Sequence, residues 1–286
     1  MNQLEHLISR AEQLIGRLES LLPAQASTVD WNAIAWRWVR HERNGTLHAV
    51  QHPHVIALEN IQFVERQKLE IVRNTQQFLQ NLPANHVLLT GARGTGKSSL
   101  IKALLNQFSS QGLRLIEVEK QDLIDLPNIV ALIRNRPEKF IIFCDDLTFE
   151  AHDASYKALK VVLDGSIEHA SSNVLVYATS NRKNLMPEYM ADNMPSKDFD
   201  GEIRPSDTIE EKTALAERFG LWLSFYAFDQ EEYLAIAAHW LSTFGLHFDA
   251  AAEKAALQFY HTRGARSGRV AYQFAKDYAG KIQLQS

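Results

Sequence analysis

Short apolar runs alternate with amphipathic segments through the middle of the chain. Each run has the length and composition of a buried strand, and helical spacing returns between successive runs. The five runs are His86–Thr90, Leu113–Val118, Phe140–Cys144, Val174–Thr179 and LWLSFYAF near Leu221. This alternation predicts an α/β domain with a five-stranded parallel sheet flanked by helices.

The first 52 residues predict a helical region ahead of that domain. Leucines and one alanine follow a three-and-four spacing from Leu4 to Leu21, which is typical of an amphipathic helix, and Pro23 ends it. Docking onto the same chain is the favoured role of this helix, and association with another chain is the alternative. Trp31, Trp36 and Trp38 then gather among basic residues. They are interpreted as a hydrophobic anchor on the main domain, with a partner surface as the alternative.

Two further helical stretches flank the apolar runs. Helical spacing runs from Ile56 to the Leu82-Pro83 stop. After Asp229, an N-cap-like residue with an acidic first turn, helical patterns continue to the end of the chain, with the last one closed by Gly280. The predicted division is a helical region at 1–52, an α/β domain at 53–226 and a small helical domain at 227–286.

Composition and charge narrow the class of protein. The 286 residues are 45% hydrophobic and carry a net charge of −4, as in an ordinary globular protein. No apolar run approaches the roughly 18 to 20 residues that a membrane span needs, and the N-terminus does not resemble a secretion signal. We therefore expect no membrane partner and a cytoplasmic location. The net negative charge gives no general attraction to nucleic acid. Nucleic acid is therefore a possible partner that nothing in the sequence supports.

The run GARGTGKS joins the first apolar run directly to a helical segment. Its glycines let the backbone turn so that N–H groups point at phosphate oxygens, and the helix adds the positive end of its dipole. Within this G-x-x-x-x-G-K-S pattern, Lys97 is expected to reach the β- and γ-phosphates and Ser98 to bind Mg²⁺. The expected nucleotide-binding residues are Gly91, Ala92, Arg93, Gly94, Thr95, Gly96, Lys97 and Ser98.

Acidic and amide side chains close two later apolar runs. Asp145 and Asp146 follow KFIIFC, where Asp145 is the predicted metal-side acid and Asp146 the candidate for polarising the attacking water. Glu150 is a competing base because its side chain is longer. Asn181 ends NVLVYATSN and can hydrogen-bond both a phosphate oxygen and the water.

Arginines supply the remaining candidate chemistry. Arg218 stands just before the fifth strand, where it could enter a neighbouring subunit's site. A surface salt bridge with Glu217 or Glu211 is the alternative. Arg266 and Arg269 lie three apart at a helix start, and either could reach the γ-phosphate. The chain has no N-K-x-D motif for reading guanine, so ATP is favoured over GTP.

The order of these motifs resembles the AAA+ ATPases from about Ile56 to the end. Within that superfamily, the chain is similar to an uncharacterised bacterial family of stand-alone AAA+ proteins. The similar strings are NTQQFLQNLPANHVLLTGARGTGKSSL, LRLIEVEK, FIIFCDDLTFE, NVLVYATSNR and ERFGLWLSFY. The resemblance implies a P-loop NTPase fold with a C-terminal helical lid.

The resemblance also assigns roles. It implies Walker A at Gly91 to Ser99, Walker B at Asp145 and Asp146, and sensor 1 at Asn181. It further implies an arginine finger at Arg218 and sensor 2 at Arg266, with Arg269 as second choice. Many AAA+ proteins have Asp-Glu where this chain has Asp-Asp, which leaves the catalytic base open between Asp146 and Glu150.

The expected function is that of an ATPase using ATP and Mg²⁺ at a subunit interface. An arginine finger implies a ring or filament of identical subunits, and ATP hydrolysis would drive movement on an unidentified macromolecular partner, expected to be a protein client. A low-turnover, ATP-dependent switch or scaffold and a DNA-handling loader are the alternatives. The segment 182–217 is rich in acids and prolines. Gating of the site or contact with a client is one interpretation of it, and a mobile surface excursion is an equal one.

Overall fold

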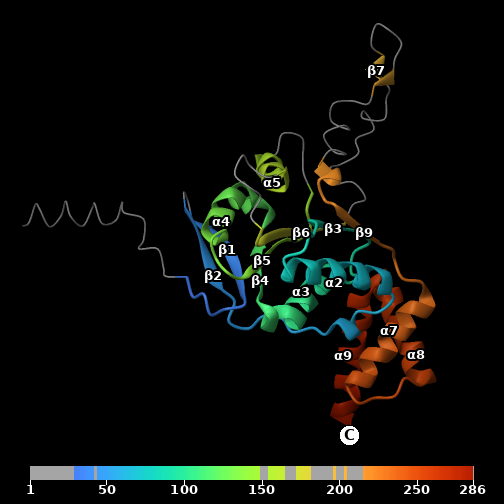
Figure 1. Cartoon of the computed structure of the whole chain (residues 1–286). Coiled ribbons are helices and arrows are strands. Elements are labelled where there is room, and N and C mark those ends of the chain that lie inside the picture. The colour runs from blue at the N-terminus through green and yellow to red at the C-terminus, as the bar shows by residue number, and fades with distance from the viewer. Residues whose placement is uncertain are drawn as a thin grey trace, which may run out of the picture.

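The computed structural model describes residues 29–41, 44–148, 154–164, 172–181, 196–197, 203–204 and 215–285. The predicted helix in 1–22, the candidate Glu150 and most of segment 182–217 lie outside these residues. Within them, a mostly parallel sheet forms the centre and three C-terminal helices form a separate bundle (Figure 1). This arrangement confirms the predicted α/β class.

The main sheet has seven strands in the order β2-β1-β4-β5-β6-β3-β9. The five predicted strands are all present and pair in parallel. They are β3 (Val87–Gly91), β4 (Leu113–Val118), β5 (Lys139–Cys144), β6 (Val174–Ser180) and β9 (Leu221–Phe225). Strand β6 separates the strand that enters the phosphate-binding turn from the strand that carries the acids.

The two additional strands correct the prediction of a helical N-terminal region. Strands β1 (Ala35–His41) and β2 (Asn44–Ala49) form an antiparallel hairpin, and β1 pairs in parallel with β4. Trp36 and Trp38 are 1% and 2% exposed, so the anchor interpretation is confirmed for both. Alternate side chains of β1 pack into the core, which suits a strand and not a helix.

Helices cover both faces of the sheet. On one face lie α2 (Glu65–Leu79) and α3 (Lys97–Phe108), whose apolar side chains pack with the buried residues of β3. On the other face lie α4 (Leu126–Ile133) and α5 (Ala154–Asp164), which pack with Trp36 and Trp38. Short 3-10 segments connect these layers. They are η1 (Leu58–Asn60), η2 (Ser109–Gln111) and η3 (Lys120–Asp125).

Helix α2 begins later than its hydrophobic spacing suggests. The segment from Ile56 to Val64 holds only the single turn η1, and Phe63 has a φ of 59°, which a helix does not allow. Ile61 and Val64 nevertheless lie in the core. The apolar residues of this segment are therefore spaced as in a helix because they pack into the core, although the backbone is not helical.

The C-terminal bundle consists of α7 (Gln230–Thr243), α8 (Ala250–Arg263) and α9 (Gly268–Gln285), with its own apolar core. Asp229 caps α7 together with Glu232 in a capping box, as its sequence position indicates. Helix α9 continues through Gly280, which corrects the predicted end, because a single glycine costs a helix only about 1 kcal/mol.

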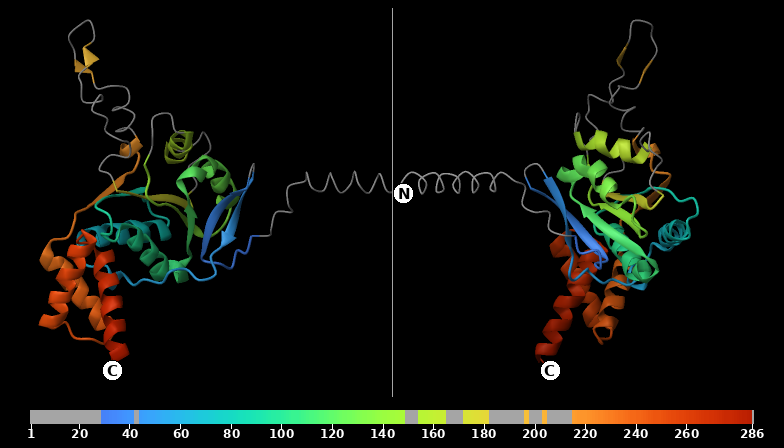
Figure 2. Two further views of the ribbon diagram at one scale, coloured as in Figure 1. Left: turned by 180° about the vertical axis from the view of Figure 1, so that it is seen from behind. Right: turned by 60° about the vertical axis from the view of Figure 1, so that its left-hand side comes forward.

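Figure 2 shows this bundle beside one end of the sheet, away from the β1–β2 hairpin. A two-stranded ladder, β7 (Ser196–Lys197) with β8 (Ile203–Arg204), completes the described strands. No helix among the described residues is long and apolar enough to span a membrane. The domain boundaries at 52/53 and 226/227 stay a prediction.

Candidate functional site

The turn between β3 and α3 is shaped by its glycines. Gly91 has a φ of 125°, and a Cβ there would lie 1.8 Å from the carbonyl oxygen of Phe225 on β9. Gly94 has a φ of 74°, and a Cβ there would collide with Ser267. Helix α3 begins directly after Gly96, which has no side chain to cap the first N–H groups. Those N–H groups and the helix dipole make the turn a site for an anion.

Lys97 lies at the centre of the site. Its Nζ donates to the carbonyl oxygens of Gly91 and Ala92 at 2.8 and 2.7 Å and to Asn181 Oδ1 at 3.1 Å. The pKa of the Lys97 ammonium lies below its usual value, chiefly because of burial. The nearby carboxylates of Asp145 and Asp146 raise this pKa, and the guanidinium groups of Arg93 and Arg269 lower it. The ammonium is thus preorganised in a partly desolvated position where a phosphate would strengthen its charged form.

The two acids are held by neighbouring polar groups. Ser98 Oγ donates to Asp145 Oδ1 at 2.6 Å, and Thr179 Oγ1 donates to the same oxygen at 2.5 Å. Asn181 Nδ2 donates to Asp146 Oδ1 at 2.6 Å. The predicted metal-side acid therefore contacts the predicted metal-binding hydroxyl, and the predicted water-polarising acid contacts the predicted sensor.

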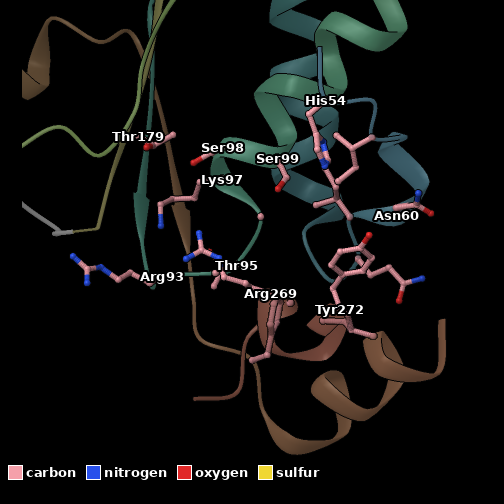
Figure 3. Close-up of a pocket in the computed structure, with 18 of the residues that line it drawn as sticks. His54, Asn60, Arg93, Thr95, Lys97, Ser98, Ser99, Thr179, Arg269 and Tyr272 are labelled. Carbon is pink, nitrogen blue, oxygen red and sulfur yellow. The ribbon is translucent and has the colours of Figure 1, made fainter. Parts of the chain in front are cut away.

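These groups line a cavity of about 620 Å³. Figure 3 shows Lys97, Ser98 and Thr179 along one side of it, while Arg269 and Tyr272 reach in from α9. The cavity brings together most of the nucleotide-binding and catalytic residues predicted from the sequence. They are Arg93, Gly94, Thr95, Gly96, Lys97, Ser98, Ser99, Asp145, Asp146, Asn181 and Arg269.

The opposite wall of the cavity was not predicted. It is formed by the segment before α2 and by the C-terminal bundle of α7, α8 and α9, which corresponds to the predicted lid, and it is partly aromatic. Trp240 and Tyr272 pack edge to face with ring centroids 4.6 Å apart. The unpredicted lining residues are His54, Val55, Ile56, Asn60, Ile61, Gln62, Phe228, Ile236, Trp240, Gly268 and Tyr272, with Thr179 on the acid side. Of these residues, only Thr179 has a signal in the sequence, because it belongs to the polar end of the run NVLVYATSN.

The structure places Arg269, and not the first choice Arg266, in the lining of the cavity. Arg269 lines the cavity one turn before Tyr272, whereas the guanidinium of Arg266 lies over the Tyr260 ring, 5.4 Å from its centroid. Helix α9 begins at Gly268, which packs against Gly94, so Arg269 is in the first turn and next to the phosphate-binding turn. Arg266 stands before the helix begins.

Arg218 does not line the cavity. Its Nε donates to Asp164 Oδ1 at the end of α5, and the two side chains form an ion pair. Within one chain, Arg218 therefore forms a salt bridge with Asp164, a different partner from the expected Glu217 or Glu211, the second of which lies outside the described residues.

The donor set fits a hard divalent cation carried by a phosphate ligand. Ser98 and Asp145 supply a hydroxyl and a carboxylate oxygen, the ligand types that Mg²⁺ prefers. Among the described residues, no cluster of three or more His, Cys, Asp or Glu side chains could hold a metal alone. The Ser98 and Asp145 oxygens suit Mg²⁺, which usually retains waters and is bound through one or two protein oxygens plus phosphates.

Comparisons with known proteins identify the family and the fold of the chain. A family model described as "Protein of unknown function (DUF815)" matches residues 31–282. A search of the curated proteins finds no match.

Several solved structures share the fold. One point mutant of Thermotoga maritima RuvB is 16% identical over 80% of this chain and 65% of its own, with a TM-score of 0.53. Another point mutant of the same protein is 16% identical over 77% and 61%, with a TM-score of 0.50. Replication initiator DnaA bound to AMPPCP and single-stranded DNA is 19% identical over 77% and 63%, with a TM-score of 0.51.

The aligned region covers only 61% to 65% of the length of these solved chains. At such identities the likeness concerns the fold alone. The strand order, the phosphate-binding turn and the helical bundle agree with it. The fold is that of an AAA+ P-loop NTPase.

Proposed function

The chain belongs to the family described as "Protein of unknown function (DUF815)", and from its site we propose that it is an Mg²⁺-dependent ATPase. One observation carries the proposal. A phosphate-binding turn, two held acids, an amide, a lid arginine and an aromatic wall all meet in a single cavity. A protein that only binds phosphate would need the turn and the lysine, but not the acids or the amide.

The protein groups divide the work by position. The N–H groups of the turn and Lys97 hold the β- and γ-phosphates, and Arg269 adds positive charge from the lid. Asp146 and Asn181 hold a water in line with the γ-phosphate, and Asp146 accepts its proton. Ser98 and Asp145 would hold Mg²⁺, which would supply charge neutralisation on the phosphates.

The aromatic wall favours a purine nucleotide. Trp240 and Tyr272 both line the cavity and pack edge to face with each other, and base rings bind aromatic surface by stacking. The absence of N-K-x-D from the sequence favours adenine. ATP is therefore the proposed substrate.

We further propose that the active unit is an assembly of identical chains. Arg218 stands ahead of β9 at the sheet edge and supplies the arginine finger to the neighbouring subunit's cavity. Hydrolysis then moves the lid and the subunits, and the work is done on a protein client. A cytoplasmic location stays a prediction from the sequence.

Three variants test the proposal. Lys97→Ala should abolish ATP binding, whereas Asp146→Asn should retain binding and lose turnover. Lys102→Ala is the matched control, because this lysine lies on the same helix and does not line the cavity. Binding is measured with a fluorescent ATP analogue and turnover by phosphate release.

The outcomes separate an enzyme from a switch. Wild-type turnover that falls in Asp146→Asn supports the ATPase. Negligible wild-type turnover at every protein concentration, with ATP binding retained, would instead support the low-turnover switch or scaffold.

A further inference from the structure

A buried hydroxyl group joins the two acids of the site. Thr179, near the end of β6, is 2% exposed. Its Oγ1 donates to Asp145 Oδ1 at 2.5 Å and accepts from the backbone N–H of Asp146 at 3.0 Å. A carboxylate only accepts and a backbone N–H only donates, so the direction of both hydrogen bonds is fixed.

The first hydrogen bond orients the carboxylate of Asp145. The same oxygen, Oδ1, also accepts from Ser98 Oγ at 2.6 Å. The two donors approach from different elements, β6 and α3, and they leave the carboxylate little rotational freedom. Of these two donors, Thr179 is the buried one.

The second hydrogen bond fixes an unusual backbone conformation. Asp146 has a φ of 52°, in the left-handed region that aspartate adopts more readily than most residues. The carbonyl oxygen of Thr179 accepts from Leu147 N at 2.7 Å, so Thr179 holds the backbone on both sides of this turn. In this conformation the short side chain of Asp146 reaches Asn181.

We propose that Thr179 is a positioning residue that sets the geometry of both acids, and that it lets this chain use aspartate where a longer acid is common. The inference rests on the proposed ATPase function. Thr179 lies in the wall of the cavity, and its proposed role is exerted through the two acids and not through a contact of its own with the nucleotide or the water. It acts on metal binding through Asp145 and on turnover through Asp146.

The test replaces the hydroxyl without changing the side-chain shape. Thr179→Val removes both hydrogen bonds, and Thr179→Ser retains them. Thr75→Val is the matched control, because Thr75 is also buried and its hydroxyl bonds to Ile71 O and to the Tyr177 hydroxyl, away from the cavity. For each variant, we would measure kcat, KM, and ATP affinity with Mg²⁺ and with EDTA.

Thr179→Val should lower kcat by about tenfold to a hundredfold, the usual cost of losing a group that orients a metal-binding carboxylate. It should also reduce the gain in ATP affinity that Mg²⁺ gives, while affinity in EDTA stays near the wild-type value. Thr179→Ser and Thr75→Val should both behave like the wild type. A general loss of stability would affect Thr75→Val as well.

Three results would overturn the inference. They are wild-type kcat and metal dependence in Thr179→Val, equal losses in Thr179→Ser, and equal losses in Thr75→Val. A wild type that binds ATP but shows no turnover contradicts the proposed ATPase instead. In that case, only the gain in ATP affinity that Mg²⁺ gives tests the role of Thr179. A gain in Thr179→Val equal to that of the wild type overturns this role.

Discussion

Arg266 and Arg269 stand three residues apart, and only Arg269 reaches the phosphate end of the cavity. Arg269→Ala should therefore lower the ATPase rate by about a hundredfold, the cost of removing one preorganised charge at a transition state. Arg266→Ala should leave the rate near that of the wild type. Steady-state phosphate release from both variants checks this prediction. A larger loss in Arg266→Ala would show that the lid moves before hydrolysis and exchanges the two arginines.

His86 makes stability depend on pH. Burial lowers the pKa of the His86 imidazole from 6.5 to about 4, and its Nδ1 accepts from the backbone N–H of Val176 at 2.9 Å. The unfolded chain binds this proton more readily than the folded chain. The contribution of neutral His86 to the free energy of unfolding is therefore fully present above about pH 6.5. It is lost as the pH drops toward 4, and the loss is roughly 3 kcal/mol.

Urea unfolding between pH 7.5 and pH 4 measures this loss. His86→Gln retains an acceptor for Val176 but does not titrate, so its stability should fall less steeply with acid than that of the wild type. Equal slopes for the two proteins would assign the acid sensitivity to other groups.

At the scale of elements, the β1–β2 hairpin depends on a close contact inside it. A Cβ at Gly45 would lie 2.0 Å from the Trp38 ring, whose indole N–H donates to Asp125 at 3.1 Å. Gly45→Ala should therefore lower the free energy of unfolding by about 1 to 3 kcal/mol, the range for an overpacked core.

Gly280 provides the opposite case for comparison. It lies within α9, and a Cβ added there would meet nothing within 4 Å, so Gly280→Ala should raise the free energy of unfolding by about 0.5 to 1 kcal/mol. Chemical denaturation of both variants measures the two shifts. A neutral Gly45→Ala would mean that the Trp38 ring moves at no cost.

The same elements explain how far the sequence predicts the structure. The five parallel strands and the Asp229 cap are encoded by local pattern and capping chemistry, and so is the phosphate-binding turn. The hairpin was missed because closely spaced tryptophans and basic residues give no clear period. Trp240 and Tyr272 could not be predicted because they belong to no contiguous motif. The folding of the lid brings them to the cavity.

At the scale of the whole molecule, the cavity of one chain lacks its proposed finger, because Arg218 pairs with Asp164 outside the cavity. Specific activity should therefore rise with protein concentration as assemblies form. Asp164→Ala should not lower it, because this change removes an ion pair of Arg218 without altering the cavity. Activity that is independent of concentration, in a protein that stays monomeric with ATP, would contradict a site shared between subunits.

A mixing experiment tests the shared site directly. Arg218→Ala lacks the finger but retains an intact cavity, while Lys97→Ala lacks phosphate binding but retains the finger. Each variant alone should lose about a thousandfold or more in rate, as expected when an arginine finger or the phosphate-binding lysine is removed. Mixed in equal amounts, they should recover a measurable fraction of wild-type activity, because the Lys97→Ala subunit supplies Arg218 to its neighbour's cavity. A mixture no more active than its components, in assemblies that demonstrably contain both variants, would place the action of Arg218 within its own chain.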